Sequence, residues 1–185
     1  MWRCRLIKVK GERLKVKGER LKVKGLIILS ILIFQFLFFG CENTTFRSSV
    51  PAYPVRVVID TRIGAFVHFQ PTSLGSHVVV NKDGYFLDDQ WVAATSAMDA
   101  WGYGGVVVYV SSFGYNAYDL ACPYCAEHGS CQACTVNGMN AVCPHCGEEY
   151  DLISGTGAPQ KGIAHEALRK LNIMNSDGRI TVTQQ

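Results

Sequence analysis

The chain has 185 residues, of which 48% are hydrophobic and 18% charged. This balance excludes wholesale disorder and suits one ordinary domain with short additional segments. Eighteen glycines, six prolines and 11% aromatic residues favour a turn-rich β protein. The net charge of +3 is divided unevenly, because residues 1–25 carry +8 and the other 160 residues carry −5. Since the body is acidic, we expect no nucleic-acid partner.

The basic leader consists largely of a seven-residue repeat. KVKGERL occupies residues 8–14 and again 15–21, and it restarts at residue 22. Each copy contains a glycine and only Val and Leu as apolar residues, which is a weak pattern for a coiled coil. We therefore interpret the repeat as a tandem duplication in the coding sequence and assign it no structural role.

Leu26–Phe39, a run of fourteen mostly apolar residues, follows the leader. A membrane-spanning helix needs about 20 such residues, whereas a basic stretch before a shorter apolar run is typical of a secretory signal peptide. The run ends at Gly40 and Cys41, which resembles the lipobox of bacterial lipoproteins, where the cysteine is lipidated and becomes the new N-terminus. The alternative is a free cysteine after a signal sequence.

The lipobox resemblance implies three segments along the chain. Residues 1–40 are then the leader and signal peptide, residues 41–53 form a polar tether, and residues 54–185 form the domain. It also implies a protein of the cell envelope, anchored by lipid to a bacterial membrane and facing the periplasm or the outside.

Short β-branched and aromatic segments separated by turns predict an all-β sandwich or barrel for the domain. Asn81–Gly84 predicts a tight turn, residues 88–101 predict a loop with at most a short helix, and Ala164–Lys170 predicts one helical turn. The predicted strands are Val55–Asp60, Ala65–Gln70, His77–Val80, Val106–Val110, Tyr115–Leu120 and Arg179–Thr183.

Six cysteines between residues 122 and 146 form three C-x-x-C pairs. The outer two pairs are separated by seventeen residues, which is a typical metal-site spacing because each pair presents two thiolates from one tight turn. In an exported protein, disulfides are the alternative. The pairs are Cys122/Cys125, Cys131/Cys134 and Cys143/Cys146.

The first pair reads CPYC, which is also the redox motif of glutaredoxins. That motif needs a preceding strand and a following helix whose N-terminus lowers the thiol pKa. Residues 126–131 are a poor helix, and no βαβ pattern surrounds them. A thiol–disulfide oxidoreductase is therefore disfavoured.

Cys143–Gly155 (CPHCGEEYDLISG) resembles the second cluster loop of Rieske iron–sulfur domains, where C-P-x-H-G leads into an aromatic-Asp strand and a Ser/Thr-Gly turn. Gly157–Pro159 and Gly162–Ala164 resemble the loop that covers the cluster in that family. Tyr118–Pro123 resembles the strand that enters the first cluster loop. The resemblance spans roughly residues 105–183 and implies a Rieske-like all-β fold with a small cysteine-rich, cluster-binding subdomain at about residues 120–164.

The ligand pattern of that family is altered in this chain. A Rieske [2Fe–2S] cluster is held by one Cys and one His from each of two loops. Cys122 and Cys143 match the two cysteine positions, but Tyr124 and Cys146 stand where the histidines would be. Tyr150 matches a tyrosine that hydrogen-bonds near a ligand sulfur in some members.

Three alternatives remain open for the cysteines. Cys131 and Cys134 have no assigned role in them, and a local disulfide or a second half-site is possible for this pair. In the first, four thiolates bind a [2Fe–2S] cluster or a structural Zn²⁺. In the second, His128 and His145 join Cys125 and Cys143. In the third, no metal binds and the cysteines form disulfides on a retained scaffold. The four-thiolate set is Cys122, Cys125, Cys143 and Cys146.

The leading hypothesis from these motifs is iron–sulfur binding and one-electron transfer at a membrane surface, with an unidentified redox protein as partner. The alternative is a non-redox binding module with a zinc site or disulfides on a degenerate Rieske scaffold. Because no Ser/His/Asp set or carboxylate pair stands out, an electron carrier or a binding module is favoured over an enzyme.

Overall fold

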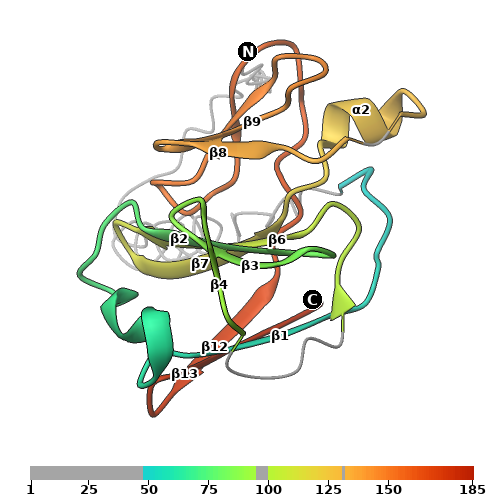
Figure 1. Cartoon of the computed structure of the whole chain (residues 1–185). Helices are drawn as coiled ribbons and strands as arrows, with labels where there is room; N and C mark the ends of the chain where they lie inside the picture. The colour runs from blue at the N-terminus through green and yellow to red at the C-terminus, as the bar shows by residue number, and fades with distance from the viewer. Residues whose placement is uncertain (1–47, 95–99, 131) are drawn as a thin grey trace, which may run out of the picture. The chain divides into compact units, whose positions relative to one another are not determined.

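Three antiparallel sheets are stacked in the computed structural model, which describes residues 48–94, 100–130 and 132–185 (Figure 1). All of these residues belong to the second of two units into which the chain divides, residues 1–44 and 45–185. The predicted leader and signal peptide, Cys41 and Cys131 lie outside the described residues. Within the described part of the chain, no helix is both long and apolar enough to cross a membrane.

The central sheet has the order β4-β3-β2-β6-β7 and lies between two four-stranded sheets. Its strands are β2 (His77–Asn81), β3 (Gly84–Leu87), β4 (Gln90–Val92), β6 (Val106–Ser111) and β7 (Gly114–Asp119). One outer sheet has the order β12-β13-β1-β5, formed by β1 (Val55–Asp60), β5 (Ala100–Trp101), β12 (Asn172–Ser176) and β13 (Arg179–Thr183). The other has the order β11-β10-β9-β8, formed by β8 (Thr135–Asn137), β9 (Asn140–Val142), β10 (Glu149–Asp151) and β11 (Pro159–Lys161).

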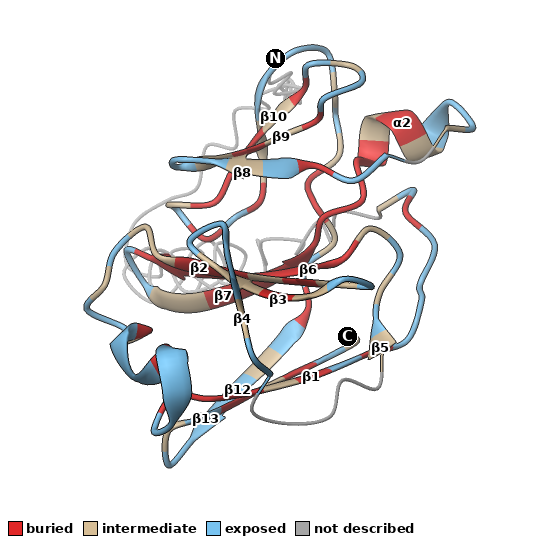
Figure 2. Ribbon diagram, in the orientation of Figure 1, coloured by how far each residue is buried: buried red, intermediate tan, exposed pale blue. Residues whose placement is uncertain are grey.

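Strand β6 separates the two hydrophobic cores of the domain. Successive side chains of a strand point to opposite faces, so Val106, Val108 and Val110 pack into the core toward β1 and β13. Val107 and Tyr109 pack into the second core, toward the cysteines. Burial on both faces explains why this strand is a continuous apolar run and is buried along its whole length (Figure 2).

The all-β prediction is confirmed, as are the predicted strands that became β1, β2, β6, β7 and β13. The prediction of a strand at Ala65–Gln70 is wrong, because Gly64–His68 forms a 3-10 helix. Its Phe66 and Phe69 are both fully buried. Their spacing of three places both rings on one face of a 3-10 turn, which a strand would not do.

Two further predictions are corrected by the structure. Residues 88–101, predicted as a loop with at most a short helix, contain strands β4 and β5 in their described part, and residues 95–99 lie outside it. Asp88 and Asp89 both have positive φ and form a two-residue hairpin turn between β3 and β4, although neither is glycine. Ala164–Lys170 contains no helix, and its Leu168 is buried in the second core.

The carboxylate of Asp119 connects the start of β6 to the first cysteine pair. It lies at the end of β7, is 1% exposed, and accepts backbone N–H groups from Tyr103 at 2.7 Å, Gly104 at 2.8 Å and Ala121 at 2.9 Å. One buried side chain therefore fixes two loops, and the second of these leads directly into Cys122.

We expect Asp119→Ala to lower the free energy of unfolding by about 3 kcal/mol or more, because three amide donors lose a charged acceptor at a buried position. Urea unfolding of the full chain measures this change. Asp83→Ala, which removes an exposed carboxylate from the β2–β3 turn, is the control and should cost less than about 0.5 kcal/mol. Equal effects of the two substitutions would contradict the role given to Asp119.

Candidate metal centre

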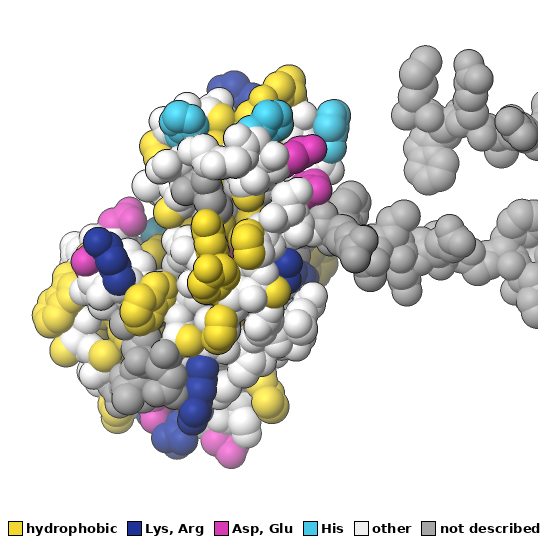
Figure 3. All heavy atoms as spheres, turned by 90° about the vertical axis from the view of Figure 1, so that its right-hand side faces the viewer, with side chains coloured by type: hydrophobic (Ala, Val, Ile, Leu, Met, Phe, Trp, Pro, Cys, Tyr) yellow, Lys and Arg dark blue, Asp and Glu magenta, His cyan; other side chains and the backbone are white. Residues whose placement is uncertain are grey.

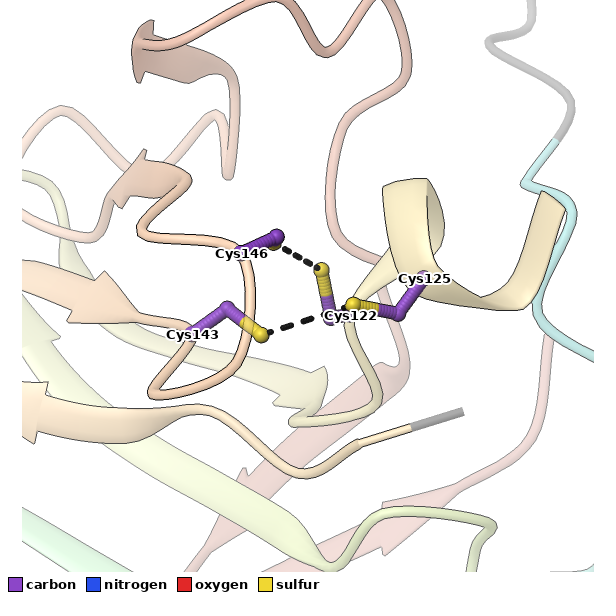
Figure 4. Close-up of side chains that lie close together, drawn as sticks. All are labelled: Cys122, Cys125, Cys143 and Cys146. Atoms are coloured by element: carbon purple, nitrogen blue, oxygen red, sulfur yellow. Dashed lines mark hydrogen bonds between the residues drawn. The ribbon is translucent and has the colours of Figure 1, made fainter. Parts of the chain in front are cut away.

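The first cysteine pair lies on one short helical turn directly after β7. Helix α2 (Pro123–Glu127) has Cys122 as its N-cap residue, in an extended conformation, and Pro123 in its first turn. Proline is favoured there because its fixed φ suits the helix and its missing N–H would have no partner. The turn closes through the Ala126 N–H to the Cys122 carbonyl at 3.0 Å. Cys122 and Cys125 thus reach the same point from the start and the body of the turn (Figure 4).

The second cysteine pair lies in the turn between β9 and β10. The Cys143 N–H donates to the Glu148 carbonyl at 2.9 Å, and the Gly147 N–H donates to the Cys143 carbonyl at 3.0 Å. Gly147 has φ of 74°, a conformation that glycine adopts without strain. This tight turn brings the thiols of Cys143 and Cys146 to the same side.

The four sulfur atoms of these two pairs meet at one point between α2 and the β9–β10 turn (Figure 4). All four Sγ atoms lie within 4.8 Å of one another. Cys122 and Cys146 are 3.6 Å apart, and Cys125 and Cys143 are 3.7 Å apart. Three of the thiols are buried and Cys146 is partly exposed. None of the five cysteines in the described residues forms a disulfide.

The sulfur group fits a thiolate-bound metal in size and in chemistry. Zn²⁺ binds four thiolates tetrahedrally at about 2.3 Å, which makes the sulfur–sulfur edge about 3.8 Å. The two measured pairs of 3.6 and 3.7 Å are close to this value. Tetrahedral four-sulfur donor sets are typical of zinc and iron–sulfur centres. The distances match a single tetrahedral ion, whereas the four-thiolate chemistry suits zinc and iron–sulfur centres alike, so the metal type is not determined by these residues.

Hydrogen bonds concentrate negative charge on Cys122. The thiol of Cys134 and then the hydroxyl of Tyr150, at 3.4 Å from the sulfur, lower the pKa of Cys122 to about 4, against the opposing effect of burial. The pKa of Tyr150 is raised, chiefly by burial and also by this hydrogen bond, so the phenol stays protonated as a donor. Without metal, Cys122 is therefore the preferred thiolate of the group.

Two other members of the sulfur group resist ionisation. Burial raises the pKa of Cys125 well above its ordinary value, and the neighbouring cysteines add to this effect. Burial also raises the pKa of Cys146 to about 11, although the N–H of Glu148 favours its thiolate. Since a metal binds thiolates, it must displace protons from both of these residues.

Histidines lie outside the sulfur group. His128 is exposed, and its Nδ1 donates to the Tyr124 carbonyl at 2.8 Å while its ring contacts the Tyr124 ring. His145 is exposed in the β9–β10 turn. Histidine side chains gather at the surface at the end of the molecule that carries α2 and the β11-β10-β9-β8 sheet (Figure 3). Of the predicted ligand sets, the structure brings together the four-thiolate set.

Cys134, for which the motifs predicted no defined role, lies buried beside Cys122. An isolated bridge pairs Ala121 with Ala133, and this register places the two thiols close together. The hydrogen bond to Cys122 is the main reason that the pKa of Cys134 is raised. In the sequence, the only signal for Cys134 was its membership of the middle C-x-x-C pair, Cys131/Cys134. Cys131 lies outside the described residues.

Comparisons with known proteins give only weak likenesses. No protein-family model matches the chain, and no curated protein matches it. Among solved structures, a chain from the complex of reduced oxygenase and oxidized ferredoxin in carbazole 1,9a-dioxygenase has a TM-score of 0.38 and 16% identity, covering 61% of this chain and 84% of that one. The Sphingomonas yanoikuyae B1 ferredoxin has a TM-score of 0.36 and 16% identity, covering 63% and 94%.

The protonated thiols predict a pH dependence of metal binding. Because Cys125 and Cys146 bind protons at neutral pH and must release them, the logarithm of the Zn²⁺ association constant should rise by at least about two per pH unit between about pH 6 and 8. Competition with a chromophoric chelator at several pH values measures the slope. A pH-independent constant would contradict ligation by these two thiols.

Proposed function

We propose that the four thiols bind an iron–sulfur centre, a [2Fe–2S] cluster, and that the protein carries single electrons. The observation that supports this most is the convergence of four sulfur atoms, from two turns far apart in the sequence, to within 4.8 Å of one another. Four thiolates are a complete ligand set for such a cluster. When bound, the cluster supplies a reversible one-electron couple, and the protein supplies its ligands and surroundings.

The surroundings of the sulfur group suit electron transfer. The Tyr150 hydroxyl donates to the sulfur of Cys122, and hydrogen bonds to ligand sulfurs are one of the means by which proteins set a reduction potential. Cys146 is partly exposed whereas the other three thiols are buried, so the centre has one edge near the surface. A redox protein could approach this edge, which supports a protein partner.

A structural zinc site is the second candidate. Its specific support is compactness, since four sulfurs within 4.8 Å of one another suit a single tetrahedral ion. In this case the metal contributes its binding free energy to folding, and the domain acts as a non-redox binding module.

The reduction potential of the reconstituted full chain tests the leading proposal. Four thiolates place more negative charge on the irons than two thiolates and two imidazoles, so the oxidised form is favoured. We expect a potential near about −400 mV, outside the Rieske range of roughly −150 to +300 mV. It should vary little between about pH 6 and 10. A high, pH-dependent potential would show that His128 or His145 is a ligand, and a colourless protein that holds zinc would favour the second candidate.

Cysteine variants provide the matched control for either metal. Cys143→Ser removes one of the four ligands and should lose most of the bound metal and destabilise the domain. Cys134→Ser changes a buried thiol outside the four-sulfur group and should keep the metal content of the wild type. Equal metal loss from both variants would contradict the assignment of ligands.

The proposal also includes a lipid anchor at Cys41, which is supported by the sequence alone. Cys41→Ser should abolish lipid labelling and move the protein from the membrane fraction to the soluble fraction, because the apolar run before it is too short to span a bilayer. Cys4→Ser, in the basic leader, should change neither property. A Cys41→Ser protein that remains in the membrane fraction after loss of its leader would refute the anchor.

A further inference from the structure

A buried carboxylate lies next to the second cysteine pair. Glu148 is 3% exposed, and its two carboxylate oxygens accept the backbone N–H groups of Ile163 at 2.8 Å and Ala164 at 3.0 Å. A Cβ atom added to Gly162 would overlap both oxygens of this carboxylate. Residues 162–164, here called the covering segment, are therefore shaped around the Glu148 side chain.

The backbone of Glu148 is bonded to the candidate ligands themselves. Its carbonyl accepts the N–H of Cys143 at 2.9 Å, and its N–H hydrogen-bonds to the sulfur of Cys146. One residue thus contacts both cysteines of the second pair through its backbone and the covering segment through its side chain.

The covering segment packs against the core that contains the thiols. It follows β11, which pairs with β10 beside the second cysteine turn. Ala164 packs against the hydrophobic cluster that includes Cys122, Cys125 and Cys143, while Ile163 is 65% exposed. The segment therefore packs on the core that contains the thiols through Ala164 and faces solvent through Ile163.

A carboxyl group buried at this position needs a physical reason. A buried carboxylate is costly unless it is paired or strongly hydrogen-bonded, and thiolates close to it would add repulsion. Among the described residues its side chain has two amide donors and no ion-pair partner. Each carboxylate oxygen accepts one of these N–H groups, so Glu148 binds two successive amides of the segment at once, which a side chain with a single acceptor oxygen does not do.

We propose that Glu148 is a positioning residue that keeps the covering segment closed over the four-thiolate centre and thereby slows exchange of the metal with solvent. This inference rests on the proposed metal centre. It assigns to Glu148 a function in metal retention, which acts through residues 162–164 and not through direct ligation.

Amide hydrogen exchange tests the closure without any metal. In Glu148→Ala the N–H groups of Ile163 and Ala164 lose their acceptor, so both should exchange about tenfold faster or more than in the wild type, in metal-free and metal-loaded full chain alike. Glu148→Gln keeps one acceptor oxygen and should give an intermediate rate. Unchanged protection in Glu148→Ala would overturn the proposal.

Release of zinc to an excess of chelator tests the consequence. Zn²⁺-loaded Glu148→Ala should release its metal about tenfold faster or more than the wild type, with Glu148→Gln in between. The control is Glu149→Gln, which alters the neighbouring carboxylate of the same hairpin. Glu149 pairs with Lys161 at 3.0 Å on the surface, and its loss should leave the release rate unchanged.

The outcomes separate this proposal from the metal centre itself. A wild-type chain that binds no metal would refute the proposed function. A wild type that binds metal, with equal release from the Glu148 variants, would keep the proposed function and overturn the role of Glu148. Equal acceleration by Glu149→Gln would also overturn it, since the effect would then be one of general charge.

Discussion

The convergence of four thiols at one point is the constraint on which the rest of this domain depends. Without metal, the surroundings favour ionisation of Cys122, while burial keeps Cys125 and Cys146 protonated. The scaffold holds the two turns together, and a metal that binds there must displace the protons of these two thiols. Because the free energy of metal binding adds to folding, metal binding and the packing of this end of the domain are coupled.

The layered sheets meet this constraint by giving the cysteine turns a rigid base. β6 faces one core with Val106, Val108 and Val110 and the other with Val107 and Tyr109. The core around the cysteines and the core toward β1 and β13 are therefore built on the same strand. The Tyr109 hydroxyl also donates to the Gly138 carbonyl in the β8–β9 turn at 3.0 Å. Asp119 then fixes the loop from which Cys122 emerges. The hydrogen bonds of the buried Tyr109 and Asp119 side chains thus help to position the cysteine turns on the central sheet.

Much of this arrangement could be predicted from the sequence, and the failures have identifiable causes. The strand at Val106–Val110 was evident because burial on both faces produces an uninterrupted apolar run. The β3–β4 hairpin was missed because its turn uses Asp88 and Asp89 at positive φ, where glycine is the usual signal. β8 and β9 contain three residues each, too few for a period-two pattern.

The candidate site was predictable where spacing carried the information. Two C-x-x-C pairs imply two tight turns, and the structure brings those four thiols together. The contact of Cys134 with Cys122 depends on the bridge between Ala121 and Ala133, a long-range pairing that no local motif encodes. The same holds for Glu148, whose partners lie fifteen and sixteen residues further along the chain.

X-ray absorption at the metal edge of the metal-loaded full chain tests the central claim most directly, because it reports the atoms bound to the metal. The account predicts four sulfur neighbours at about 2.3 Å for a zinc-loaded chain, and an all-sulfur first coordination sphere for iron. Nitrogen neighbours from imidazole, or fewer than four sulfurs, would contradict a centre built from Cys122, Cys125, Cys143 and Cys146.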